Sequence, residues 1–102
     1  MTEYELLETD DFSKEFFKLP IEIQLRFDKQ FRRLVLDPYG IGDPIKGRRW
    51  FRELKNKKYR VYYVIFEDKV VVMLVGISVK KNQQKTIDEI MDGLDKWKQM
   101  SR

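Results

Sequence analysis

Residues 50–78 read WFRELKNKKYRVYYVIFEDKVVVMLVGIS and contain three runs with the composition of β-strands. The runs are WFREL (50–54), YRVYYVIF (59–66) and KVVVMLVGIS (69–78), and only short turn sequences separate them. Parallel neighbours would need crossovers of a dozen or more residues, so these turns predict an antiparallel meander. Alternate residues of the middle run share a face, with Arg60, Tyr62, Val64 and Phe66 on one and Tyr59, Val61, Tyr63 and Ile65 on the other. The last run is almost wholly apolar, which predicts a strand covered on both faces.

Helical periodicity precedes and follows the meander. Residues 4–9 form a short strand candidate, and residues 10–19 have helical spacing, with Asp10 or Asp11 available as the cap. Residues 20–37 predict a second helix with Pro20 in its first turn, and the stretch DPYGIGDP ends it. The apolar stripe of this second helix consists of Ile23, Phe27, Phe31, Leu34 and Val35.

A final helix is predicted over residues 86–100, where Thr86 and Glu89 have the spacing of a capping box. Its apolar stripe consists of Ile87, Ile90, Met91, Leu94 and Trp97. The predicted order is β-α-α-β-β-β-α. This order predicts an α+β fold, with two N-terminal helices and one C-terminal helix packed on an antiparallel sheet.

The composition limits the chemistry that the chain can perform. A length of 102 residues predicts a single domain, residues 1–102. Histidine and cysteine are absent, which excludes the usual zinc sites, Cys–His pairs and Ser–His–Asp triads. A Mg²⁺ site built from Asp and Glu stays formally open, but the acidic residues are scattered, and we expect no cofactor and no metal. No apolar run is long enough for a membrane span and the N-terminus is acidic, so we expect a cytoplasmic protein.

Positive charge is concentrated in residues 45–60, IKGRRWFRELKNKKYR, which hold eight Lys or Arg and one Glu. The stretch carries +7, whereas the whole chain carries +4, so the remaining residues sum to −3. If Arg60 and the Lys80–Lys81 pair meet at one end of the sheet, they form a cationic hollow suited to RNA. The candidate RNA-binding residues are Lys46, Arg48, Arg49, Arg52, Lys55 and Lys57. A solvated basic turn is the alternative, and the interleaved aromatic rings fit the core as well as base stacking.

Arg60 stands out because it interrupts an apolar and aromatic strand, where arginine is rarely buried without an anionic partner. Two interpretations stay open at this point. The guanidinium either contacts a phosphate or pairs with a structural carboxylate such as Glu53 on the neighbouring strand.

The order of FRELK, YRVYY and the apolar strand ending in Lys80-Lys81 resembles the RelE/ParE superfamily of type II toxin–antitoxin toxins, in particular its RelE- and HigB-like branch. The upstream PIKGRRW is similar to the loop that leads into the first meander strand of that family. The similarity spans the chain through the order and spacing of the motifs.

This resemblance implies a metal-independent endoribonuclease, an mRNA interferase, that cuts messenger RNA at the ribosome and is neutralised by a cognate antitoxin in a hetero-oligomer. The RNA 2′-OH is the expected nucleophile, and cationic side chains stabilise the scissile phosphate. By position, Arg60 corresponds to the arginine that contacts this phosphate. Lys80 or Lys81 corresponds to the second basic residue, and together these three are the candidate catalytic residues.

Two other functions remain as alternatives. A ParE-like gyrase inhibitor has the same fold and would not need the cluster formed by Arg60, Lys80 and Lys81. A catalytically weak or inactive binding protein is favoured by Phe51, Glu53 and Ile87, which stand where the best-studied branch has other residues.

Overall fold

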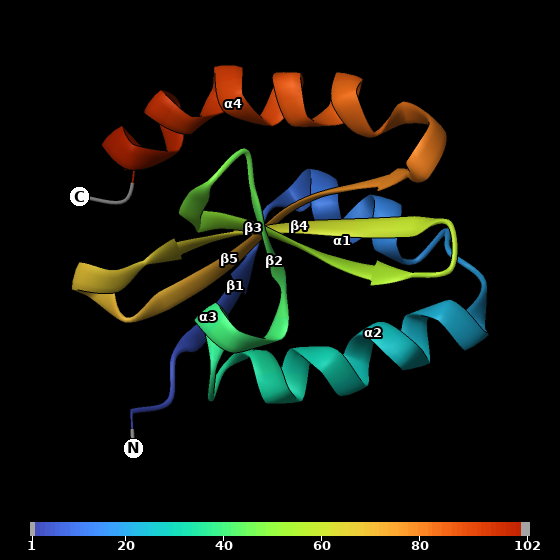
Figure 1. The fold of residues 1–102 in the computed structure, drawn as a ribbon, viewed down its shortest axis with the longest axis horizontal. Helices are drawn as coiled ribbons and strands as arrows, with labels where there is room; N and C mark the ends of the chain where they lie inside the picture. Colours follow the sequence, from blue (N-terminus) through green and yellow to red (C-terminus); the bar gives the residue numbers. More distant parts are fainter. Residues whose placement is uncertain (1, 101–102) are drawn as a thin grey trace.

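The computed structural model describes residues 2–100, and the side chains of residues 2–94. Figure 1 shows an α+β fold in which helices cover a twisted sheet. Its elements are β1 (Glu5–Glu8), α1 (Asp10–Phe16), α2 (Ile21–Leu34), α3 (Pro38–Ile41), β2 (Asp43–Ile45), β3 (Arg48–Asn56), β4 (Tyr59–Phe66), β5 (Val71–Val79) and α4 (Gln83–Met100). Short 3₁₀ turns, η1 (Glu67–Lys69) and η2 (Lys80–Asn82), precede and follow β5.

The predicted meander is confirmed, because β3 pairs with β4 and β4 pairs with β5, both antiparallel. The sheet has five strands in the order β1-β5-β4-β3-β2. The α+β class is also confirmed, but the sheet is mixed, because β1 lies parallel to β5. A parallel pair needs a crossover connection, and the helices and strands between β1 and β5 supply it.

The stretch DPYGIGDP does end α2, but it also forms α3 and the three-residue strand β2, which the sequence did not predict. Proline and glycine weaken the strand pattern in this stretch. An edge position nevertheless tolerates Pro44, because one side of an edge strand needs no ladder hydrogen bond. The sheet is therefore one strand wider than predicted.

Two predicted helix caps are wrong. The cap of α1 is Thr9, whose Oγ1 accepts a hydrogen bond from the Phe12 N–H at 3.1 Å. Asp10 and Asp11 lie in the first turn instead, where their charge favours the helix dipole. The last helix, α4, begins at Gln83, so Thr86 lies inside the helix and does not form the capping box predicted for residues 86–89.

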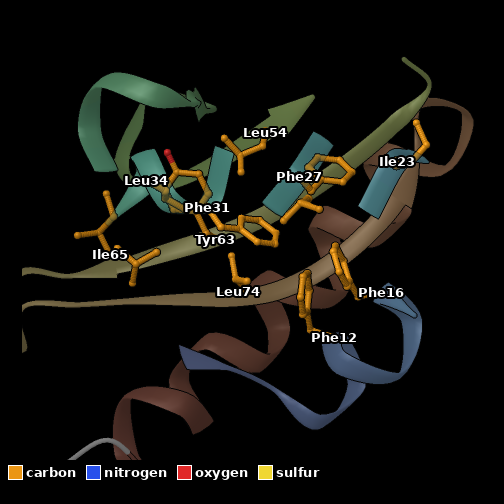
Figure 2. Close-up of a cluster of buried hydrophobic side chains, with 12 residues drawn as sticks. Phe12, Phe16, Ile23, Phe27, Phe31, Leu34, Leu54, Tyr63, Ile65 and Leu74 are labelled. Atoms are coloured by element: carbon orange, nitrogen blue, oxygen red, sulfur yellow. The ribbon is translucent and has the colours of Figure 1, made fainter. Parts of the chain in front are cut away.

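A core lies on each side of the sheet. Figure 2 shows the larger core, where Phe12 and Phe16 of α1 and Phe27 and Phe31 of α2 pack against β4 and β5. The ring centroids of Phe12 and Phe16 lie 5.5 Å apart. The predicted stripe of α2 is confirmed, with Val35 half-buried at the end of the helix.

The second core lies under α4 and includes Ile87, Ile90 and Leu94 of that helix. Met91 packs at its edge, and the side chain of Trp97 lies outside the described residues. The alternation predicted for β4 is confirmed, because Val61, Tyr63 and Ile65 belong to the α1/α2 core and Tyr62 and Val64 to the α4 core. Both faces of β4 and β5 are therefore covered, as the apolar sequence of β5 predicted.

Candidate functional site

The basic stretch does not form one patch, because it folds into two hairpins whose turns lie at opposite ends of β3. The Lys46-Gly47 turn joins β2 to β3, with φ values of 52° and 77°, and the Lys57-Lys58 turn joins β3 to β4. A strand of nine residues separates the turns, which at about 3.3 Å per residue is on the order of 30 Å. Three of the predicted RNA-binding residues, Lys46, Arg48 and Arg49, therefore lie at the end of β3 far from Arg60.

Arg49 contacts Tyr39 at that distant end of β3. Its guanidinium carbon lies 4.7 Å from the ring centroid of Tyr39, a distance typical of a cation–π contact. The Tyr39 hydroxyl donates to Glu67 Oε2 at 2.7 Å, and the Tyr4 hydroxyl donates to the same oxygen at 2.8 Å. Burial, together with this hydrogen bond, raises the pKa of Tyr39 to about 12. This cluster fastens α3 and the N-terminal strand to the turn before β5.

Arg52 has a structural role that the sequence did not predict. Its side chain is only 7% exposed and points to the α1/α2 side of the sheet, opposite to Arg60. Its Nη2 donates to the backbone oxygens of Tyr39 at 2.7 Å and Gly42 at 2.6 Å, and its Nη1 donates to that of Arg49 at 3.3 Å. We therefore leave Arg52 out of the candidate site, since its donors already hold the α3–β2 connection to the sheet.

The remaining cations gather where the β3–β4 turn meets the end of β5, on the right in Figure 1. The Lys80 N–H donates to the Lys58 backbone oxygen at 2.7 Å and fixes η2 beside the turn. Lys58, Val79, Lys80 and Lys81 line a shallow depression of about 560 Å³. We call the exposed Lys57, Lys58, Lys80 and Lys81 the lysine rim. Four cations in adjoining turns repel one another, and a polyanion would relieve that repulsion.

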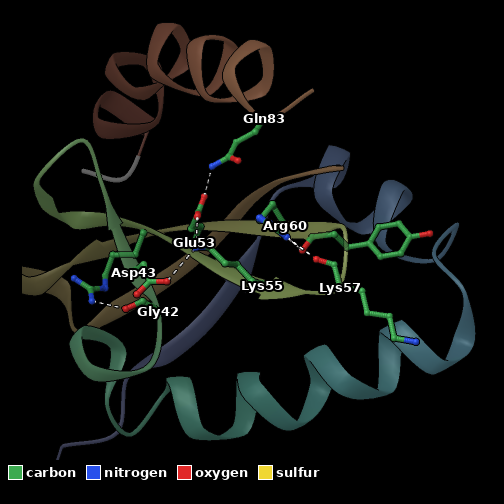
Figure 3. A network of polar contacts seen from close by, with 9 residues as sticks. Gly42, Asp43, Glu53, Lys55, Lys57, Arg60 and Gln83 are labelled. Atoms are coloured by element: carbon green, nitrogen blue, oxygen red, sulfur yellow. Dashed lines mark hydrogen bonds and ion pairs between the residues drawn. The ribbon is translucent and has the colours of Figure 1, made fainter. Parts of the chain in front are cut away.

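Arg60 lies on the α4 side of β4, directly opposite Lys55 of β3 and Ser78 of β5. Its guanidinium turns back toward the hairpin, where Nη1 donates to the backbone oxygens of Lys57 at 2.9 Å and Tyr59 at 3.0 Å (Figure 3). The side chain is 8% exposed, and its buried Nε, like the Nε of Arg52, has no hydrogen-bond partner among the described residues. A buried arginine donor without a partner is costly.

The predicted structural alternative for Arg60 is a pair with Glu53, and it does not form. The contacts of Glu53 are with Lys55 Nζ, at 3.6 Å, and with Gln83 Nε2, which donates to Glu53 Oε2 at 2.9 Å. Figure 3 shows Gln83 reaching from the start of α4 down to this carboxylate. Within residues 2–94, no carboxylate lies within ion-pair distance of Arg60.

Lys55 and Lys57 make weak ion pairs with nearby carboxylates. Lys55 Nζ lies 3.5 Å from Asp43 Oδ2 as well as near Glu53, and Lys57 Nζ lies 3.8 Å from Glu22 Oε1. The Lys55–Asp43 and Lys57–Glu22 side chains are half or more exposed, so each of these pairs contributes little to stability and is readily exchanged for a phosphate. Lys55 therefore lies opposite Arg60 on β3, and Lys57, Lys80 and Lys81 lie in the turns at the same end of β4, with the Lys57 side chain directed toward Glu22 of α2.

The tyrosines beside the site are sealed in the core. Tyr62 is fully buried, and its hydroxyl forms a 2.7 Å hydrogen bond with Ser78 Oγ. Burial raises the pKa of Tyr62, so its hydroxyl stays protonated near neutral pH. Tyr63 donates to the Pro38 backbone oxygen at 2.7 Å on the other side of the sheet. The core interpretation of the interleaved aromatic rings is confirmed for Phe51, Tyr62 and Tyr63, which are fully buried, whereas Trp50 and Tyr59 are only partly buried at the edges of the two cores.

Among the described residues, no group of three or more His, Cys, Asp or Glu is placed to hold a metal ion. In the same part of the chain, no helix is long and apolar enough to cross a membrane.

Two contributors were absent from the predicted site. Lys58 lies in the two-residue β3–β4 turn, and its backbone oxygen accepts the hydrogen bond from the Lys80 N–H. Gln83, at the start of α4, donates to the Glu53 carboxylate. The sequence carried a signal for Lys58, because in a meander the turn between the first two strands lies beside the end of the third. No comparable signal marked Gln83, whose position depends on where α4 begins.

A scan against protein-family models finds no match, and a search of curated proteins finds none with significant similarity. Solved structures do match. A mutant of E. coli RelE in the free state is 19% identical, with a TM-score of 0.72 over 87% of this chain and 99% of that chain. RelE in the intact E. coli RelBE toxin–antitoxin complex is 22% identical, with a TM-score of 0.68 over 74% of this chain and 95% of that chain.

The archaeal RelE–RelB complex from Pyrococcus horikoshii also matches in structure, with 20% identity and a TM-score of 0.62 over 78% of this chain and 96% of that chain. The matched structures share the helix–sheet arrangement of this chain at low sequence identity. The chain therefore has the fold of the RelE toxin superfamily.

Proposed function

We propose that this protein is the toxin of a type II toxin–antitoxin pair and that it cleaves messenger RNA at the ribosome. The matched structures include toxins bound to their antitoxins, which supports a cognate antitoxin as the partner of this chain. The observation that carries the nuclease assignment is the place of Arg60, a guanidinium with no carboxylate pair among the described side chains, next to the turns that carry the lysine rim.

The scissile phosphate lies against Arg60 in this proposal, and the neighbouring phosphates lie on the lysine rim. The RNA 2′-OH gives its proton to water and attacks the adjacent phosphorus while the bond from phosphorus to the 5′ oxygen breaks, and the departing 5′ oxygen takes a proton from water. A 2′,3′-cyclic phosphate and a 5′-hydroxyl end result. Negative charge grows on the phosphate oxygens during attack, and cations already in place stabilise it without reorganisation.

The surroundings of Arg60 suit this electrostatic role. Backbone oxygens hold Nη1 toward the hairpin, which fixes the guanidinium plane. A charge-assisted hydrogen bond from guanidinium to phosphate is roughly twice as strong as a neutral one. Because the Tyr62 hydroxyl is buried and hydrogen-bonded to Ser78, the site acts through its positive charge and not through a tyrosine acid or base.

The test is expression without an antitoxin. Wild-type protein should arrest translation, whereas Arg60→Ala should relieve the arrest at equal levels of folded protein. Lys46→Ala is the matched control, because it removes a cation at the far end of β3, and it should arrest translation like the wild type. Normal growth with abundant folded wild-type protein would contradict the proposal, and DNA damage with intact mRNA would indicate the gyrase alternative.

A catalytically inactive binding protein is the second candidate, and specific observations favour it. Arg60 is only 8% exposed, and the Glu53 carboxylate lies among the site cations, where it repels phosphate. Primer extension on translated mRNA separates the two candidates. Ribosome binding without cleavage would support the inactive protein, and cleavage that depends on Arg60 would support the nuclease.

A further inference from the structure

The outer edge of β5 is paired along only part of its length. Strand β1 covers Val71–Leu74, and the last backbone bond on that side is from the Thr9 N–H to the Leu74 oxygen at 3.1 Å. A bulge follows, because Tyr63 pairs with Leu74 and Tyr62 with Gly76. Beyond the bulge, within the described part of the chain, Gly76–Val79 pair with β4 alone.

Specific backbone groups face this open edge. The Lys80 N–H donates to the Lys58 oxygen of the β3–β4 turn. In an antiparallel ladder every second residue exchanges such bonds, so Ser78 and Gly76 bond to β4 as well. Ile77 therefore directs its N–H and C=O groups outward, and Val79 its N–H, while the Val79 C=O accepts the first bond of the turn η2. These two donors and one acceptor need water or another strand as a partner.

A slot leads to these groups. Helix α1 lies against one side of β5 and α4 against the other, and two adjoining cavities of about 330 and 280 Å³ run between them along the edge. Both cavities are lined by Glu15, Ile77 and Thr86, so they form one continuous groove, which we call the edge slot. Gly76 lies on its floor, where a Cβ atom would come within 2.8 Å of Ile90 Cδ1.

The charge of the edge slot is opposite to that of the lysine rim. Asp11 and Glu15 lie one turn apart on α1, and Glu89 faces them from α4. The single cation in the lining is Lys18, whose Nζ lies 3.5 Å from Glu15 Oε1. Both of these side chains are more than half exposed, so the pair is weak and exchangeable. Three carboxylates repel RNA and attract Lys or Arg.

We propose that the edge slot binds an extended, basic segment of a partner protein, which adds to β5 as a further strand. Ile77 and Val79 supply the backbone hydrogen bonds of this β-augmentation. Side chains of an added strand alternate between faces, so one set of basic residues reaches Asp11 and Glu15 and the other reaches Glu89. The proposal does not depend on RNA cleavage, because the slot and the lysine rim use different residues.

The other edges of the sheet are less suited to a new strand. Strand β2 has three residues and contains Pro44, and the exposed edge of β1 carries Glu5 and Glu8 in four residues. Short length, proline and charge are the usual protections against edge pairing. The β5 segment in the slot has neither proline nor charge in Gly76–Val79.

The test uses the full chain and a labelled peptide about six residues long, with Lys at neighbouring positions so that both faces of the added strand carry Lys. Binding should slow amide exchange of Ile77 and Val79 by about tenfold or more, while Gly76 and Ser78, already bonded to β4, change little. A matched peptide with Glu in place of Lys should bind at least about fivefold more weakly, and Glu15→Gln with Glu89→Gln should remove that preference.

A backbone variant tests the strand pairing itself. Val79 has a φ of −90°, close to the value that proline imposes, so Val79→Pro removes the outward N–H and leaves the β4 ladder intact. This variant should bind the peptide about tenfold more weakly than Val79→Ala, which keeps the N–H. Unchanged exchange at Ile77 and Val79, equal binding of the Glu peptide, or equal binding by Val79→Pro and Val79→Ala would each overturn the proposal.

Discussion

The lysine rim makes RNA binding depend on salt, and the structure gives the size of that dependence. Each phosphate that a cation neutralises releases counterions, and for single-stranded RNA this contributes about −0.7 to the slope of log K against log salt. The perturbation we choose is Lys80→Ala with Lys81→Ala. Both lysines are exposed in η2 and lie outside the core, so the double variant should fold as the wild type does.

The expected magnitude follows from counting the cations of the lysine rim and the neighbouring Arg60. The four lysines of the rim and Arg60 together predict a slope of about −3.5 for the wild type. Removing two lysines should reduce the slope to about −2.1. The affinities of the two proteins should therefore differ most at low salt and converge as the salt concentration rises.

Fluorescence anisotropy of a labelled single-stranded RNA, titrated over a range of KCl concentrations, measures these slopes. The control is Lys46→Ala with Arg48→Ala, which removes the same charge at the far end of β3 and should leave the slope at the wild-type value. The reasoning is refuted if the two double variants show equal slopes, because charge would then act through the whole molecule and not through the rim.

Three further predictions concern individual residues. Glu53→Gln should raise RNA affinity about threefold to fivefold in the same assay, because it removes the carboxylate that lies among the site cations; a loss of affinity would contradict this. Arg52→Leu should lower the free energy of unfolding by about 2–3 kcal/mol in urea without changing the salt slope, since it leaves the Tyr39 and Gly42 carbonyls unpaired; an altered slope would place Arg52 in the site. The pKa of Tyr39 is raised from its ordinary value near 10 to about 12, so its stabilising contribution is complete below pH 10 and is lost as the pH rises toward 12. Urea unfolding across that range should show Tyr39→Phe losing less stability than the wild type, and equal losses would contradict the assignment.

Much of the fold could be predicted because the local signals agree with the tertiary structure. The period-two alternation of residues 59–66 is reproduced by burial of Tyr63 on one side of the sheet and Tyr62 on the other. Short turns left the meander as the simplest connection. The parallel β1–β5 pair could not be predicted, because a strand of four residues carries no information about its partner.

The candidate site was less predictable, because a linear run of charge does not show where a strand separates its members. Lys46 and Lys57 are eleven positions apart in a single basic stretch, yet they occupy turns at opposite ends of β3. Arg52 and Arg60 both interrupt apolar strands, but the sequence did not show which arginine would hold the α3–β2 connection through its carbonyls. The sequence did not predict the elements of that connection.

The edge slot also had no signal in the sequence. It exists because β1 ends beside Leu74 and a bulge follows at residue 75. Bulges arise from pairing with a neighbouring strand, and the apolar run of residues 69–78 gives no sign of one. Gly76 was the one visible hint, since glycine inside a strand often marks a bulge or a close approach.

The central claim is that a phosphate of RNA reaches the Arg60 guanidinium through the lysine rim. NMR of the Arg60 Nε–H during titration with a 2′-O-methyl oligonucleotide, which cannot be cleaved, tests this claim most directly. The account predicts a large downfield shift of the Arg60 Nε–H as it gains an acceptor, together with shifts at Lys58, Lys80 and Lys81. Saturation of the protein with an unchanged Arg60 signal, or with shifts confined to Lys46 and Arg48, would contradict it.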